Sequence, residues 1–163
     1  MLRELRIHDP MHYHGPVRRT VSYRSGLFTA QGLRSISTDM DLPGLPTQLP
    51  PSWKNLNHLF IYSPISLGLA HQLLSHCCNL VGCLLVIRWP WSDDAFSNNS
   101  TTFSSLHLPH LEFLSLDGLG VDSDICTGWL FRKIKVPLLR TLNYPKYPCI
   151  HSNAIPLPPH LRV

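Results

Sequence analysis

A six-residue pattern, L-x-x-L-x-φ with φ an apolar residue, recurs along the chain and restricts the folds open to it. The two central copies, Leu56 to Ile61 and Leu80 to Leu85, keep apolar residues at the first, fourth and sixth positions. In an extended strand the fourth and sixth side chains point to one face, and the third and fifth point to the other. The remaining copies begin at Leu2, Leu33, Leu111 and Leu139.

The copies begin 23 to 31 residues apart, which is close to the period of leucine-rich repeats. Ser63 and Pro64 suit a helix cap and a first helical residue, and the apolar residues from Ile65 to Leu74 have helical spacing. A strand, a helix and a strand of the same pattern make one turn of a solenoid. We therefore predict an α/β fold: an irregular leucine-rich-repeat-like solenoid. Its parallel sheet would have about five or six short strands, with helices and loops on the other face.

The predicted solenoid covers residues 1–144, and residues 145–163 form a proline-rich C-terminal tail. The connections inside the solenoid differ from one another. Residues 39–55 are proline-rich and should be irregular, and residues 88–106 form a Ser- and Asn-rich insertion. Uneven connections of this kind predict repeats of variable length around one apolar spine.

A second helix is predicted between the last two copies of the pattern. Asp122 or Ser123 can cap it, apolar residues up to Ile134 share one face, and Pro137 ends it. The Asn or Cys typical of the ninth repeat position is missing, so we expect irregular turns. The residues found there are Pro10, Asp41, Pro64, Arg88, Leu119 and Tyr147.

The charge of the chain is divided into zones. Hydrophobic residues make up 44% and charged residues 15%, as in a globular protein. Residues 1–34 carry a formal charge of +4, residues 35–124 carry −6, and residues 125–163 carry +6. A nucleic-acid-binding protein gathers its basic residues on one face, whereas here an acidic middle separates two basic ends. We therefore expect no nucleic-acid partner.

The sequence contains neither a secretory signal nor a membrane span. The longest apolar run, Leu80 to Ile87, is far shorter than the roughly 20 residues that a spanning helix needs. The five cysteines are an odd number, and the contiguous Cys77 and Cys78 make a poor disulfide framework. We therefore expect reduced cysteines and an intracellular protein, cytoplasmic or nuclear. Because the sequence has no membrane span, we also expect no membrane partner.

The chain contains two groups of possible metal ligands. Zinc sites usually have two spaced pairs of Cys or His, and neither group has that spacing. We expect a solvated loop for the first group, core packing for the cysteines of the second, and no metal or cofactor in either. The first group is His8, His12 and His14, and the second is His71, His76, Cys77, Cys78 and Cys83.

No catalytic motif stands out. The chain lacks G-x-S-x-G, H-E-x-x-H, the Walker A loop and G-x-G-x-x-G. Its paired acids, Asp93 with Asp94 and Asp122 with Asp124, fall in a loop and at a helix start, where carboxylates are ordinary. The prediction is a protein that is not an enzyme.

Four further motifs stand out in the central part of the chain: LPPSWKNLNHL (residues 49–59), SPISL (63–67), LLSHCCNL (73–80) and LPHLEFLSL (108–116). These motifs resemble the leucine-rich-repeat region of F-box-like proteins from mushroom-forming (basidiomycete) fungi. The resemblance covers approximately residues 27–144.

This resemblance implies a target-recognition module of a ubiquitin-ligase substrate receptor. In that family the repeats hold a target protein, while an N-terminal F-box docks the ligase adaptor. No helical F-box precedes the first repeat at Leu2, so we expect a fragment or a truncated product, with an adaptor partner only if an F-box lies upstream. The alternative is a truncated repeat scaffold with no active partner or catalytic role.

The outward positions of the strands supply a candidate protein-binding face. Phe60, Leu84 and Phe113 fall on three consecutive strands and predict an apolar patch between polar ends. The alternative is that the insertion at residues 88–106 or the proline-rich tail folds over this patch. The candidate residues of the face are His58, Phe60, Leu84, Phe113 and Ser115.

Overall fold

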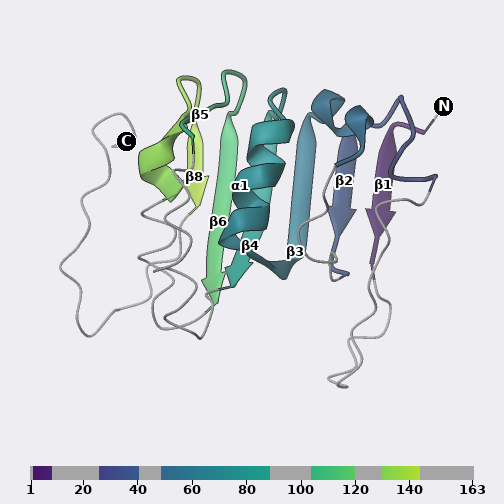
Figure 1. The fold of residues 1–163 in the computed structure, drawn as a ribbon, viewed down its shortest axis with the longest axis horizontal. Coiled ribbons are helices and arrows are strands. Elements are labelled where there is room, and N and C mark those ends of the chain that lie inside the picture. The colour runs from purple at the N-terminus through teal and green to yellow at the C-terminus, as the bar shows by residue number, and fades with distance from the viewer. Residues whose placement is uncertain (1, 9–25, 41–48, 89–103, 120–129, 144–163) are drawn as a thin grey trace.

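The computed structural model of the chain is an α/β fold built on a parallel sheet (Figure 1). It describes residues 2–8, 26–40, 49–88, 104–119 and 130–143. Six strands are hydrogen-bonded in the order β1-β2-β3-β4-β6-β8, and every neighbouring pair is parallel. The strands are β1 Glu4–Ile7, β2 Ser35–Thr38, β3 His58–Ser66, β4 Gly82–Arg88, β6 Phe113–Leu119 and β8 Thr141–Asn143.

Each strand of this sheet begins at the third position of one copy of the six-residue pattern. In β3, β4 and β6, His58 pairs with Gly82 and Gly82 with Phe113, so equivalent positions stand side by side. The same register continues to both ends of the sheet. The predicted parallel sheet of about five or six short strands, formed by consecutive copies of the pattern, is therefore confirmed, with six strands.

A repeated pair of backbone hydrogen bonds fixes this register where the strands begin. The carbonyl oxygen of Asn57 accepts bonds from the N–H groups of Val81, at 2.7 Å, and of Gly82, at 3.0 Å. The carbonyls at the same second position of four other copies accept two bonds each in the same way. They belong to Arg3, Arg34, Val81 and Glu112. The variable spacing of the copies is thus taken up by the connections and not by the sheet.

The inward side chains of the strands form the core. Leu59, Cys83 and Leu114, at the fourth position, are 0% exposed. Four of the six first-position leucines, Leu33, Leu56, Leu80 and Leu111, are also 0% exposed and belong to the core, whereas Leu2 is exposed. Burial weakens toward the ends of the sheet, where Leu5 is 7% exposed and Leu142 is only half-buried.

One helix, α1 (Leu67–His76), connects β3 to β4 and packs on the inward face of the sheet (Figure 1). Its cap is Ser66, whose hydroxyl accepts a bond from the Leu69 N–H at 3.2 Å. The predicted cap at Ser63 and Pro64 is wrong, because β3 continues through both residues. The register of β3 against β4 shifts between Ile61 and Pro64, and such an irregularity accommodates a proline that lacks an N–H.

A short 3-10 helix, η1 (Pro51–Asn55), precedes β3 in the predicted proline-rich connection. Trp53 is 0% exposed, and its indole N–H donates to the carbonyl oxygen of Phe28 at 3.0 Å. The Ser52 hydroxyl donates to the same oxygen at 3.1 Å. The Phe28 and Trp53 rings lie 5.8 Å apart between centroids. These contacts attach the connection to a turn 25 residues earlier in the chain.

A second, two-stranded parallel sheet joins β5 (Leu106–His107) to β7 (Ile134–Lys135). Residues 130–133 are helical, but Ile134 lies in β7, so the predicted helix ends sooner than expected. The earlier residues of the predicted helix, most of the Ser- and Asn-rich insertion and the whole tail fall outside the described residues. Among the helices of the described ranges, none is long and apolar enough to cross a membrane.

Candidate protein-binding face

The structure brings the five predicted residues of the binding face together on the outward side of β3, β4 and β6. His58 and Phe113 lie in one row with Gly82 between them. Phe60, Leu84 and Ser115 form the next row along the strands. We refer to the five predicted residues as the central patch; they are His58, Phe60, Leu84, Phe113 and Ser115.

Gly82 makes room for the His58 ring within the central patch. A Cβ atom at Gly82 would lie 2.9 Å from Cδ2 of His58 and 3.6 Å from Cζ of Phe60. The two rings are tilted by 45°, with their centroids 6.0 Å apart. The imidazole therefore extends over the glycine and continues the apolar surface from β3 toward β4.

The apolar members of the central patch are half-buried, whereas their inward neighbours are completely buried. Phe60, Leu84 and Phe113 each retain part of their surface in contact with solvent. The described helical segments bury Trp53, Leu73 and Phe131 in the core with the inward leucines, so they lie on the opposite side of the sheet. The alternative prediction is that the insertion or the tail covers this patch. Apart from the two ends of the insertion, both segments lie outside the described residues.

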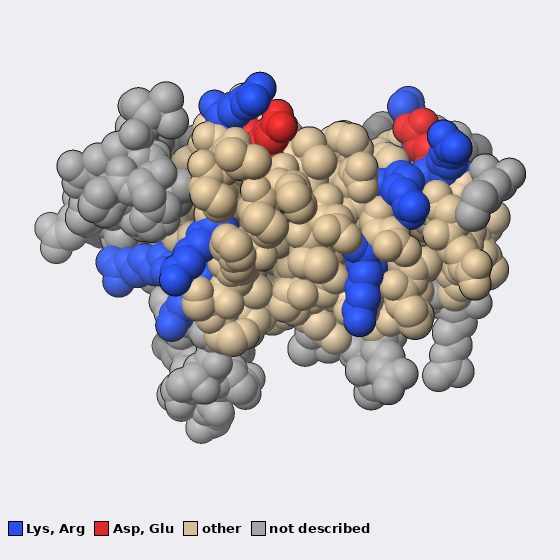
Figure 2. All heavy atoms as spheres, turned by 90° about the horizontal axis from the view of Figure 1, so that it is seen from above, with Lys and Arg blue, Asp and Glu red and all other residues tan. Residues whose placement is uncertain are grey.

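Seen from above, most of the visible charged side chains lie toward the two ends of the sheet, and one basic side chain lies between these groups (Figure 2). At one end Arg6 Nε lies 2.6 Å from Glu4 Oε1, and toward the other Arg140 Nε lies 3.7 Å from Glu112 Oε2. Most of these side chains are largely exposed, so each pair adds at most about 1 kcal/mol to stability. The central patch therefore lies between these two ion pairs, although Arg88 of β4 and Asp117 of β6 place charges on the central strands as well.

Asp117 adjoins the central patch and was missed by the sequence analysis. It follows Ser115 on the outward side of β6, directly opposite Val86 of β4. Its residue surface is half-buried, and its Oδ1 atom is buried without a hydrogen-bond partner. The alternation of β6 continues past the six-residue pattern, and extending it by one residue would have placed this carboxylate on the outward face.

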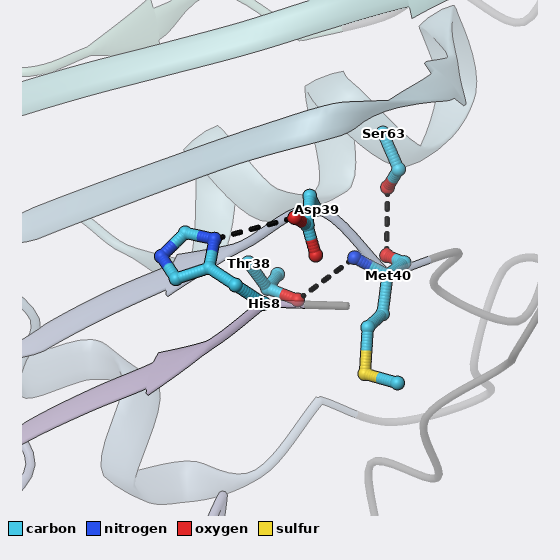
Figure 3. A network of polar contacts seen from close by, with 5 residues as sticks. All are labelled: His8, Thr38, Asp39, Met40 and Ser63. Carbon is cyan, nitrogen blue, oxygen red and sulfur yellow. Dashed lines mark hydrogen bonds and ion pairs between the residues drawn. The ribbon is translucent and has the colours of Figure 1, made fainter. Parts of the chain in front are cut away.

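A polar network lies where β1, β2 and β3 end or bend (Figure 3). His8 Nδ1 is 3.4 Å from Asp39 Oδ2. The Met40 N–H donates to Thr38 Oγ1 at 3.1 Å, and the Ser63 hydroxyl donates to the Met40 carbonyl oxygen at 2.8 Å. The Ser63 hydroxyl therefore donates to the backbone of Met40 and not to the His8 ring. These contacts connect the ends of β1 and β2 to β3. His12 and His14 fall outside the described residues.

The second group of possible metal ligands, His71, His76, Cys77, Cys78 and Cys83, does not converge on one point. Its two histidines each make a separate hydrogen bond to a distant part of the chain. Nε2 of His71 donates to the Ser104 carbonyl oxygen, and Nε2 of His76 donates to the Pro50 carbonyl oxygen, both at 3.1 Å. Burial raises the pKa of the Cys77 thiol to about 12, with a smaller contribution from Cys78. Burial likewise raises the pKa of Cys83, with Cys77 contributing.

These shifts predict selective alkylation of the cysteines. Iodoacetamide attacks the thiolate, and at pH 8 a pKa near 12 leaves about a thousandfold less thiolate than an ordinary cysteine has. Exposed Cys78 should therefore react first in the native chain, and Cys77 and Cys83 only in denaturant. Peptide mass spectrometry measures each site separately. Equal labelling of Cys78 and Cys83 under native conditions would contradict the buried position of Cys83.

In the described ranges, no three side chains of His, Cys, Asp or Glu are grouped so that they could hold a metal ion. The comparisons with known proteins add no relative: no family model, no curated protein and no solved structure matches the chain.

Proposed function

We propose that this chain is a protein-binding repeat module that holds its partner on the central patch. The observation that carries the proposal is the register of β3, β4 and β6. Phe60 and Leu84 are paired side by side on the outward face, and Phe113 lies in the adjacent row, on the side of the sheet away from α1. Apolar groups collected on such a face favour a protein partner.

The energetics of the patch favour burial by a partner. Each Å² of apolar surface removed from water contributes about 25 cal/mol, and aromatic side chains remove the most. The Phe60 ring already packs near the His58 ring, with 6.0 Å between the centroids, so it loses less side-chain entropy on binding than a free side chain would. Polar residues at the ends of the sheet would form the rim that such interfaces have.

The resemblance to F-box-like proteins suggests how such a module would be used. The repeats would select a target for ubiquitination, and a separate F-box would contact the ligase adaptor. In this proposal the chain works in the cytoplasm or nucleus, binds protein and not nucleic acid, and carries out no catalytic step. The repeat pattern and its parallel sheet are what support a leucine-rich-repeat solenoid.

A variant with Phe60→Asp and Leu84→Asp tests the proposal. Partners captured by the tagged chain from a fungal lysate should be lost by the variant, because two carboxylates would have to be desolvated in the interface. Quantitative mass spectrometry of the two captures measures the loss, which we expect to exceed tenfold. Circular dichroism checks that the variant remains folded.

The matched control replaces two exposed leucines outside the outward face. Leu27 and Leu138 are 52% and 53% exposed and lie in turns, so Leu27→Asp with Leu138→Asp introduces the same two charges. This control should capture the same partners as the parent chain. Retention of every partner by the Phe60 and Leu84 variant would exclude the central patch as the binding surface.

A further inference from the structure

We infer that Asp117 selects partners that carry a Lys or Arg next to the apolar side chain that occupies the central patch. The inference rests on the proposed function and adds the chemistry of the partner. The occupant is an extended protein segment with a basic residue and an apolar residue on the same side.

Asp117 differs from the other described acidic residues in its contacts. The structure describes the side chains of four acidic residues, and three of them have a basic neighbour. Glu4 pairs with Arg6, Asp39 with His8, and Glu112 with Arg140. Asp117 forms no ion pair with a described residue, although Arg88 lies diagonally across from it on β4, and its Oδ1 atom makes no hydrogen bond. A half-buried carboxylate without a donor is the group that gains most from an added cation.

The position of Asp117 relates it directly to the central patch. Its nearest outward neighbours are Ser115 on the same strand and Val86 on β4, and Leu84 lies diagonally across from it. These three neighbours carry no charge, whereas Arg88, the other diagonal neighbour on β4, is an exposed cation on the same face. Val86 and Leu84 would cover the methylene groups of a Lys or Arg side chain while its charged end reaches the carboxylate.

The spacing in the sheet defines the spacing in the partner. Leu84 and Asp117 are one strand apart and two residues apart along the strands, which corresponds to roughly 8 Å between their Cα positions. In an extended segment, alternate side chains lie on one side and are separated by about 7 Å. A basic residue two positions from an aromatic or aliphatic residue therefore fits both sites.

Display selection tests this inference with a defined probe, a library of random seven-residue peptides panned on the full chain. We expect the recovered peptides to be enriched in Lys or Arg two positions from an apolar residue. A synthetic peptide of the enriched sequence should bind Asp117→Asn about tenfold more weakly than the parent chain, and this difference should shrink as salt screens the ion pair. Replacing the basic residue of the peptide with Gln should remove the difference between the two chains.

The control variant is Glu4→Gln, which changes the net charge equally at the far edge of the sheet. It should bind the basic peptide as the parent chain does. Enrichment of apolar peptides without a basic residue, or equal binding by Asp117→Asn, would overturn the role of Asp117 and leave the proposed function intact. If no peptide is recovered beyond those that the Phe60 and Leu84 variant also recovers, the proposed function fails as well.

Discussion

Replacing Leu59 or Leu114 with Ala is expected to lower the free energy of unfolding by about 2–5 kcal/mol. Both side chains are 0% exposed and occupy equivalent fourth positions two strands apart. Removing three carbon atoms from either one eliminates transfer free energy and leaves a cavity between the sheet and its covering elements. The loss is a large share of the roughly 5–15 kcal/mol by which a typical domain is stable.

Urea denaturation followed by circular dichroism measures the two changes. Leu27→Ala serves as the control, because the Leu27 side chain is 52% exposed and its truncation should change stability by no more than about 0.5 kcal/mol. Leu5→Ala should fall between the two, since Leu5 lies on the edge strand β1. If Leu59→Ala and Leu27→Ala had equal effects, the inward register of the strands would be wrong.

The sheet could be predicted because its signal is local and repeated. Leu59 and Leu114 recur at the same position of a short pattern, and strand alternation alone assigns them to the inward face. The same alternation correctly grouped Phe60, Leu84 and Phe113 on the other face. Parallel strands of equal pattern then have only one register that buries all the leucines together.

The features that sequence analysis missed depend on contacts between distant residues or on a local preference that tertiary structure overrode. Ser63 and Pro64 have the composition of a helix start, but Ser63 instead donates to Met40 while the strand continues to Ser66. Strands β5 and β7 have only two residues each, too few to show any alternation. Asp117 lies one residue beyond the six-residue pattern, and the pattern assigns an inward or outward face only to its own six positions.

The largest single-residue effect is expected from Trp53→Ala, at about 3–5 kcal/mol. Trp53 is 0% exposed, and its indole combines a large buried surface with the 3.0 Å bond to the Phe28 carbonyl oxygen. Truncation would remove the packing against the Phe28 ring and leave that oxygen with the Ser52 hydroxyl as a remaining side-chain donor. The connection before β3 would then lose its main attachment to the core.

Trp53→Phe separates the two contributions. It keeps an aromatic ring next to Phe28 but removes the N–H donor, so about 1–2 kcal/mol of the loss should come from the hydrogen bond and the smaller ring. A double-mutant cycle with Ser52→Ala measures how far the two donors to the Phe28 oxygen substitute for each other, and we expect a coupling of at least about 0.5 kcal/mol. If Trp53→Ala were no more destabilising than Leu27→Ala, η1 would not be anchored to the core as described. The strand that carries His58 and Phe60 begins three residues after η1, so loss of this anchor should also weaken partner binding without any change in the central patch itself.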